Sequence, residues 1–392
     1  MTASIVSFDW EAGGSKQVLY IGSDHEVHEL SVVAGGSWQH ANISQRARTS
    51  ARIADNFATH LIGFAWEDNR SKQVFFVDNL NHVHELFVQA GGDWNHADLT
   101  TLIPLYLMYP GIGYAWKAGR SKHLVHPTMG AILEAHVEIG GRWGTRNLTV
   151  EARVPVAART YSGLGSLVGG ASFAGYDWQT ANSQQVAYIG IDNHIHELYT
   201  GADGIWHYAD LTARARARGM SAPDASSLER NSFIAGYGWE EGHTKQVLYF
   251  DDTGAINELY CRVGEDWNWA NLTDLSRAPR VSSSRYNRMV GYGWREGGTK
   301  QVVYIGDDRH VHELVCGLNS NWTSADLTNL SGGAPLAHPT DNLIAACGWH
   351  EGRTKQVVYV DANRHVVELY CGLDGVWRFA DLTARTSSPA VG

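Results

Sequence analysis

Short apolar or aromatic runs alternate with clusters of Gly, Asn, Asp and Ser along almost the whole chain. In the block around residues 289–328, the runs VGYGW, QVVYIG and VHELVC are separated by REGGTK and DDRH and followed by GLNSNW and TSADLT. Runs of this length bounded by such clusters are typical of strands joined by hairpin turns. Each block therefore predicts four antiparallel strands. No helical period long enough to interrupt them is present, so we expect an all-β protein.

The block repeats seven times. One Trp ends the opening strand of each block: Trp10, Trp66, Trp116, Trp178, Trp239, Trp294 and Trp349. A second Trp follows 28 residues later in six blocks and 27 residues later in the third: Trp38, Trp94, Trp143, Trp206, Trp267, Trp322 and Trp377. The repeats run over approximately 5–44, 61–100, 111–149, 173–212, 234–273, 289–328 and 344–383.

Seven four-stranded units bury their faces mutually when they stack around an axis, which predicts a seven-bladed β-propeller with four antiparallel strands per blade. Small residues shortly before the first Trp suit the crowded axis: Gly63, Gly113, Gly175, Gly236, Gly291 and Ala346. We therefore expect residues 1–392 to form one closed ring, although the length alone would suit two or three domains. The longer segment 213–232, with Arg214, Arg216 and Arg218, is interpreted as a solvated connection rather than an anion site.

Composition excludes several classes of protein. Only 18% of the 392 residues are charged and the net charge is −10, which argues against a nucleic-acid partner and against binding to anionic membranes. No apolar run is long enough to predict membrane insertion. The start, MTASIVSFDWEAGGSK, has no basic or apolar leader segment. We therefore expect a cytoplasmic protein, or one exported by a non-classical route.

The cysteines and histidines do not predict a cofactor or a metal. Cys261, Cys316 and Cys371 occupy one repeat slot in different blades, and Cys347 lies in an opening strand, so we expect free thiols. His-x-His pairs share a strand face and so suggest zinc: His82/His84, His194/His196 and His310/His312. The other blocks replace one or both histidines: Ala255 and Asn257, Ala131 and Leu133, and Val367 beside His365. Further ligands do not recur, so no metal site is predicted.

A glutamine and a glutamate recur 12 residues apart in six blocks, and the glutamate interrupts an otherwise apolar strand. A carboxylate there is costly unless it is hydrogen-bonded or exposed in a cleft. Amides and carboxylates bind sugar hydroxyls and an aromatic ring covers the apolar sugar face, so the second Trp completes a candidate site. The candidates are Gln17, Glu29 and Trp38; Gln73, Glu85 and Trp94; Gln185, Glu197 and Trp206; Gln246, Glu258 and Trp267; Gln301, Glu313 and Trp322; and Gln356, Glu368 and Trp377. Block three departs from this pattern with His123 and Glu134, 11 residues apart.

A structural role for the same residues stays open. A repeated Glu can satisfy polar groups between blades, and the first Trp of each block is expected to be core. For the second Trp, core packing and sugar stacking remain equal alternatives.

The combination QVVYIGDDRHVHEL, followed by Trp and ADLT, resembles the repeat of the seven-bladed fucose-binding lectins of the Photorhabdus luminescens lectin type, over roughly residues 5–385. It is more distantly similar to the six-bladed fungal lectins of the Aleuria aurantia type. In the fungal type an Arg on the second strand and a Glu on the third hold fucose hydroxyls. The resemblance implies that the Glu of each block has this role and that the Arg position is Gln, or His123 in block three. It also implies sites between adjacent blades, with those flanking block three the weakest.

We therefore expect a multivalent lectin for L-fucose or related glycans, including O-methylated ones, with no cofactor. Its partners would be fucosylated or methylated glycans and glycoconjugates, and the resemblance suggests a homo-oligomer. One alternative is a propeller glycan lyase or hydrolase, but catalysis needs a singular acid, base or nucleophile whereas this polar pair repeats. The one-off residues cluster in block three, where drift explains them: His123, His126, His136, Arg142 and Arg146. The other alternative is a non-catalytic scaffold for protein interactions.

Overall fold

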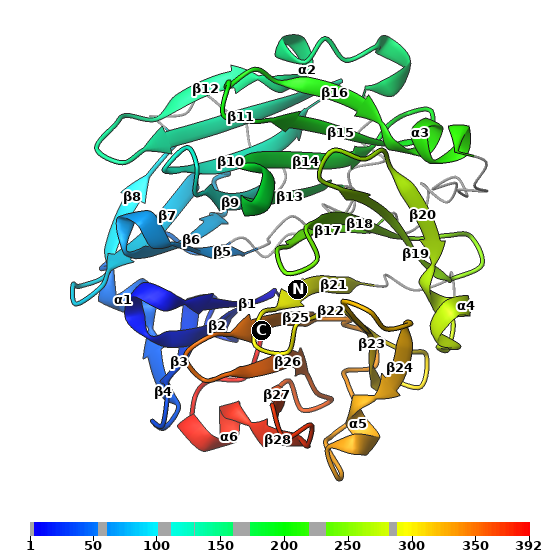
Figure 1. Cartoon of the computed structure of the whole chain (residues 1–392). Coiled ribbons are helices and arrows are strands. Elements are labelled where there is room, and N and C mark those ends of the chain that lie inside the picture. The colour runs from blue at the N-terminus through cyan, green and yellow to red at the C-terminus, as the bar shows by residue number, and fades with distance from the viewer. Residues whose placement is uncertain are drawn as a thin grey trace.

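The computed structural model describes residues 4–53, 61–100, 111–128, 130–159, 173–218, 233–281 and 288–392. Within these residues the chain forms seven four-stranded antiparallel sheets arranged in a ring (Figure 1). Each sheet is a meander in which every strand pairs with its neighbours in sequence. The prediction of an all-β seven-bladed propeller is confirmed.

The strands follow the repeats. The first blade contains β1 (Ile5–Trp10), β2 (Ser15–Ile21), β3 (Val27–Val33) and β4 (Gln39–Asn42). The second contains β5 (Ile62–Trp66), β6 (Ser71–Val77), β7 (Val83–Gln89) and β8 (Asn95–Asp98). The third contains β9 (Ile112–Trp116), β10 (Ser121–Thr128), β11 (Ala131–Glu138) and β12 (Gly144–Asn147). The fourth contains β13 (Phe173–Trp178), β14 (Ser183–Ile189), β15 (Ile195–Thr200) and β16 (His207–Asp210).

The fifth blade contains β17 (Ile234–Trp239), β18 (Thr244–Phe250), β19 (Ile256–Arg262) and β20 (Asn268–Asn271). The sixth contains β21 (Met289–Trp294), β22 (Thr299–Ile305), β23 (Val311–Gly317) and β24 (Thr323–Asp326). The seventh contains β25 (Ile344–Trp349), β26 (Thr354–Val360), β27 (Val366–Gly372) and β28 (Trp377–Asp381).

Short helices follow the fourth strand in six blades, and the sequence analysis did not predict them. They are α1 (Ile43–Arg46), α2 (Leu148–Glu151), α3 (Leu211–Ala217), α4 (Leu272–Ser276), α5 (Leu327–Leu330) and α6 (Leu382–Thr386). In the sixth blade the Asp326 carboxylate accepts a hydrogen bond of 3.0 Å from the Asn329 N–H, which caps the helix. Leu327 is fully buried, and the Thr328 hydroxyl accepts from the Val311 N–H at 2.9 Å. The recurring ADLT sequence thus caps a helix that is too short to show a helical period.

Part of the segment interpreted as a solvated connection is therefore helical. Arg214 and Arg216 lie in α3, and residues 219–232 lie outside the described residues. A 3₁₀ turn follows the opening strand in the first, second and fourth blades, at Glu11–Gly13, Glu67–Asn69 and Gln179–Ala181. A further 3₁₀ turn spans Val156–Ala158.

The small residues of the opening strands are required by close packing between blades. A Cβ atom at Gly291 would lie 2.3 Å from the ring of Tyr237, and one at Gly236 would lie 2.4 Å from the ring of Tyr176. An alanine at either position would displace a buried tyrosine of the preceding blade. The crowding expected near the axis is therefore present.

The ring closes between the first and seventh blades, which are neighbours in Figure 1. Each blade is formed by four consecutive strands, so the first and last blades do not share a sheet built from both ends of the chain. The C-terminal residues instead cross to the first blade, where Val391 forms an isolated bridge with Gly22. The Ser23 N–H also donates to the Ala390 carbonyl at 3.0 Å. No helix among the described residues is long and apolar enough to cross a membrane.

Candidate functional site between the blades

A lysine on the second strand of one blade meets the recurring glutamate on the third strand of the preceding blade. This ion pair joins six of the seven pairs of neighbouring blades. The Nζ to carboxylate distances are 2.5 Å for Lys16–Glu368, 2.5 Å for Lys72–Glu29, 2.7 Å for Lys245–Glu197, 2.6 Å for Lys300–Glu258 and 2.7 Å for Lys355–Glu313, and Lys122 pairs with Glu85. Both partners are buried in every pair. The recurring Glu therefore has a partner that the sequence analysis did not consider.

The recurring glutamine lies on the same face of the sheet as the glutamate. Gln17 is opposite Ser31 and Leu19 is opposite Glu29, so Gln17 and Glu29 are diagonal neighbours. Both contact Lys72 of the next blade, whose Nζ lies 3.0 Å from the Gln17 Oε1. Lys16, adjacent to Gln17, points the other way because neighbouring strand residues face opposite sides. The first, second, fifth, sixth and seventh blades thus present Gln and Glu to the next blade and Lys to the previous one.

The glutamines are also held within their own strand. The Gln185 amide donates to the Ser183 hydroxyl at 2.6 Å, and the Gln246 amide donates to the Thr244 hydroxyl at 2.5 Å. Each of these glutamines is 0% exposed. Their carbonyl oxygens are buried without a hydrogen-bond partner among the described residues, as are those of Gln73 and Gln301. A buried acceptor with no donor is unusual in a folded protein.

Aromatic rings surround the lysine. The Lys245 Nζ lies 5.5 Å from the ring centroid of Trp178, 5.2 Å from that of Tyr199 and 5.0 Å from that of Trp267. These distances are within the range of cation–π attraction. Trp178 and Tyr199 belong to the fourth blade and Trp267 to the fifth. The structure thus combines Gln185 and Glu197 with the second Trp of the following repeat, whereas Trp206 of their own repeat packs in the cluster between the third and fourth blades.

In the first, second, sixth and seventh blades as well, the second Trp lies beside the lysine of its own blade. Trp38 is half-buried, whereas Trp94, Trp322 and Trp377 are buried beside the lysine of their own blade. The first Trp of each block is also buried, except for the half-buried Trp116. All seven first-Trp indole N–H groups lack a hydrogen-bond partner among the described residues. Their burial agrees with the expected core position.

A pocket of about 410 Å³ opens between the fourth and fifth blades. Its lining includes Gln185 and Glu197 of the fourth blade and Lys245 and Trp267 of the fifth. Arg214 of α3 reaches its edge, where it lies 3.7 Å from Asp266. The pocket offers a carboxylate, an amide and an ammonium group beside aromatic rings, a combination that can bind a polyhydroxylated ring with an apolar face.

Burial disfavours the charged forms of the ion-paired residues. It raises the pKa of Glu197 and of Glu258, and the Lys245 and Lys300 ammonium groups oppose this rise. Burial likewise lowers the pKa of Lys72, against the attraction of Glu29. Each partner therefore depends on the other to keep its charge. A buried pair of this kind can exchange one contact for a ligand hydroxyl more readily than it can lose its partner.

The interface between the third and fourth blades differs from the other six. Gln184 replaces the lysine, and its Oε1 accepts a hydrogen bond of 3.0 Å from the Tyr114 hydroxyl. Glu134 is fully buried and lies 2.9 Å from His123 Nδ1, 3.6 Å from His136 Nδ1 and 3.4 Å from Arg146 Nε. His123, His136 and Arg146 thus substitute for the missing ammonium group.

The lysine is the main residue that the sequence reasoning missed. Its signal was present, because a Lys directly precedes the recurring Gln in the first and second blocks and in the fifth to seventh, and precedes His123 in the third. The four cysteines are free thiols. Cys261 lines the pocket, and burial raises its pKa to about 11, so the thiol is protonated and poorly reactive at neutral pH.

No protein-family model matches the chain, and no curated protein matches it in sequence. Solved structures of propeller lectins do match. The BP39L lectin from Burkholderia pseudomallei superposes with a TM-score of 0.65 at 14% identity, over 96% of this chain and 98% of that one. The Aleuria aurantia lectin bound to Fucα1-6GlcNAc gives 0.52 at 14% identity, over 83% and 94%. The SapL1 lectin bound to α-methyl fucoside gives 0.52 at 13% identity, over 100% and 96%.

The chain shares the β-propeller architecture of these lectins, although the Aleuria aurantia lectin has six blades and this chain has seven. At such low identity the likeness concerns the fold alone, so the ligand has to be argued from the residues between the blades.

Proposed function

We propose that this protein is a non-catalytic, multivalent lectin that binds L-fucose or related glycans, including O-methylated ones, in pockets between adjacent blades. The observation that carries the proposal is the recurrence of one polar and aromatic set at six of the seven interfaces. The similarity in fold to lectins whose structures contain fucosides supports this choice of sugar. Repetition favours binding over catalysis, because a catalytic centre needs a singular arrangement.

The pocket between the fourth and fifth blades defines the proposed chemistry. Glu197 accepts hydrogen bonds from sugar hydroxyls, Lys245 donates one, and the unpartnered Gln185 carbonyl oxygen accepts another. Trp267 or Tyr199 covers the apolar face of the ring. An O-methyl group suits the same aromatic wall, because its burial gains free energy in proportion to the apolar area removed from water.

We expect weak binding per site, with a dissociation constant of roughly 0.1–1 mM, about −5 kcal/mol. Several such sites on one rigid ring raise the affinity for clustered glycans by about 10²–10⁴ when they bind together. A homo-oligomer would multiply this effect. We expect the interface containing Glu134 to bind sugar most weakly, because Arg146 and two imidazoles already contact the Glu134 carboxylate.

The proposal is tested by glycan-array screening followed by calorimetric titration with methyl α-L-fucoside. We expect several equivalents per chain, and agglutination of cells that carry fucosylated glycans. Glu197→Gln should remove about one equivalent, whereas the exposed Glu138→Gln in the third blade should leave the stoichiometry unchanged. An array that is blank for fucosides and for every other sugar would contradict the lectin proposal. Depolymerisation of a polysaccharide by the pure protein would favour an enzyme instead.

A further inference from the structure

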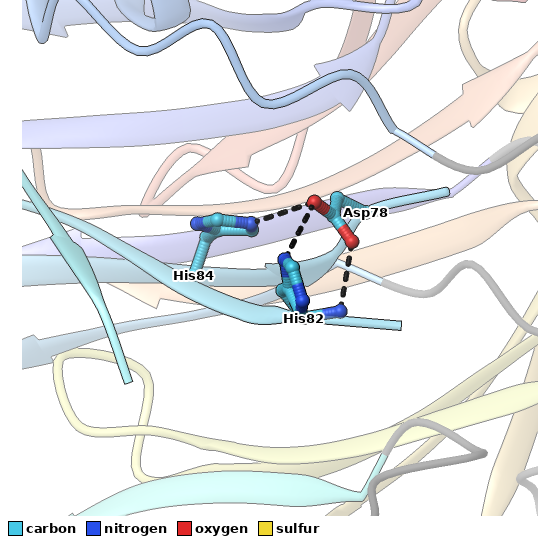
Figure 2. A group of neighbouring side chains, drawn as sticks. All are labelled: Asp78, His82 and His84. Carbon is cyan, nitrogen blue, oxygen red and sulfur yellow. Dashed lines mark hydrogen bonds and ion pairs between the residues drawn. The ribbon is translucent and has the colours of Figure 1, made fainter. Parts of the chain in front are cut away.

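Three side chains at the hairpin between β6 and β7 converge on one point (Figure 2). Asp78 lies directly after β6, His82 lies in the turn and His84 lies near the start of β7. The Asp78 Oδ2 lies 3.4 Å from His82 Nδ1 and 3.1 Å from His84 Nε2, and the three ligand atoms are all within 4.8 Å of one another.

These distances are compatible with a metal site. Ligand atoms about 2.0–2.1 Å from a tetrahedral zinc ion lie roughly 3.3–3.4 Å from one another. An ordinary hydrogen bond between imidazole and carboxylate is shorter, about 2.7–2.9 Å. The 3.4 Å separation of Asp78 and His82 matches the metal value, and the 3.1 Å separation of Asp78 and His84 lies between the two.

His84 supplies a second observation. Its side chain is only 5% exposed, and its Nε2 has no hydrogen bond of acceptable geometry although it points at Asp78. Its Nδ1 is 2.9 Å from His96 Nε2, so a second imidazole fixes the ring orientation. A metal-binding histidine commonly uses its second nitrogen in this way. When the Nδ1 of His84 donates to His96, the Nε2 carries a lone pair directed into the cluster.

Asp78 is prepared for the same role. Its Oδ1 accepts hydrogen bonds from the backbone N–H groups of Leu80 at 2.8 Å and His82 at 2.7 Å, which leaves Oδ2 for another partner. The two backbone hydrogen bonds thus hold the carboxylate in place.

The corresponding hairpins show why the second blade is different. In the sixth blade His310 Nδ1 lies 2.7 Å from Asp326 Oδ2, and in the fourth blade His194 Nδ1 lies 2.8 Å from Asp210 Oδ2. These are hydrogen-bond distances, so that nitrogen already has its partner. In the second blade Asp98 instead accepts from the Thr100 N–H at 2.9 Å, and His82 faces Asp78.

We propose that Asp78, His82 and His84 bind one divalent transition-metal ion, with a fourth coordination position open on the side where His82 reaches solvent. Two imidazoles and one carboxylate suit Zn²⁺, and also Co²⁺, Ni²⁺ or Cu²⁺. This differs from the expectation drawn from the sequence, in which His-x-His pairs without recurring further ligands predicted no metal. Asp251 and Asp361 occupy the position of Asp78 in the fifth and seventh blades, but neither blade has both histidines. The site needs no recurrence, because the second blade combines the aspartate with His82 and His84.

The test uses the untagged full chain, stripped with EDTA and titrated with Zn²⁺ by calorimetry, with retained metal measured by mass spectrometry. We expect one equivalent per chain. His82→Gln and Asp78→Asn should each weaken binding by about 100-fold or more. His310→Gln is the matched control and should leave the equivalent in place. Because His82 is 41% exposed, its replacement should not disturb the fold, as circular dichroism would verify.

Co²⁺ provides an independent readout, because the absorption of a four-coordinate site differs from that of hexaaqua Co²⁺. Wild-type protein and His310→Gln should show the four-coordinate spectrum, and His82→Gln should not. Absence of Zn²⁺ binding at millimolar concentration would overturn the proposal. So would an equivalent that survives in His82→Gln, or one that is lost in His310→Gln. None of these measurements depends on sugar binding.

Discussion

The Lys245 ammonium of the fifth blade contacts both carboxylate oxygens of Glu197 in the fourth, at 2.7 and 2.8 Å. The sheet hydrogen bonds lie within each blade, so neighbouring blades adhere mainly through side chains. In this ring a buried ion pair joins six of the seven interfaces. The same side chains line the pocket proposed to bind sugar, so structural and binding roles meet in one set of residues.

Removing one partner of the Lys245–Glu197 pair should destabilise the fold. Lys245→Met leaves a buried carboxylate without its counter-charge, at a cost of about 3–5 kcal/mol in the free energy of unfolding. The double variant Lys245→Met with Glu197→Gln should lose less than the sum of the single variants, because it leaves no unpaired charge whereas each single variant does. Urea denaturation of the four proteins measures this coupling. Additive losses would show that the pair contributes no net attraction.

Variants of Trp267 and Trp206 should distinguish sugar stacking from core packing. Trp267 lines the pocket beside Lys245, whereas Trp206 packs at the interface without a lysine. Trp267→Phe should therefore remove about one equivalent of methyl α-L-fucoside, as judged by calorimetry. Trp206→Phe should cost similar stability, because both side chains are buried, but should not change the stoichiometry. Equal stoichiometry in the two variants would assign both Trp residues to the core.

Removal of Arg146 should make the stability of the interface between the third and fourth blades depend on pH. Burial, and next the Arg146 charge, lower the pKa of His136. In Arg146→Gln that second cause disappears and the pKa of His136 rises, while Glu134 keeps only imidazole partners. Burial still lowers this pKa, but by less than in the wild type, so protonation of His136 at low pH costs the folded variant less stability than it costs the wild type.

The Arg146→Gln variant should thus unfold more easily than the wild type by about 1–3 kcal/mol at pH 8, and by less at pH 5.5. Thermal melts across this range check the difference. The exposed Arg142→Gln, in the same blade, is the control and should follow the wild type. A loss that is independent of pH would mean that the imidazoles do not compensate for Arg146.

Asp177 should lower stability at neutral pH. Burial raises its pKa to about 7; the Lys117 N–H opposes the rise, and the charge of Glu240 adds to it. Between pH 4 and 7 the folded protein then binds a proton that the unfolded chain has released, so stability falls as the pH rises through this window.

Asp177→Asn removes that loss, because an amide replaces the carboxylate and can still accept from the Lys117 N–H. We expect a gain of about 1–3 kcal/mol at pH 8 and little change at pH 4, measured by chemical denaturation. Asp252→Asn, at an exposed carboxylate, should show no such pH dependence. A gain of equal size at both values would point to a cause other than proton binding.

Much of the fold was predictable because the signals are local. The period-two patterns in VHEL and QVVY, and the turns between them, give each blade its four strands. The helices after the fourth strands were missed because four to seven residues are too few to show a period, although the Asp or Asn cap before each was visible. The binding residues were only partly predicted. Gln185 and Glu197 do share one face, but Lys245 and Trp267 come from the next repeat.

The sequence by itself determined the number of blades, the order of their strands and the recurrence of one polar and aromatic set. These properties depend on residues within about 30 positions of one another, and the repetition makes them recognisable in the sequence. Which residues meet was decided by the tertiary structure alone. Lys16 and Glu368 are 352 positions apart, and only closure of the ring brings them together. The environment between two blades is created by packing, so no pattern within one repeat could reveal it.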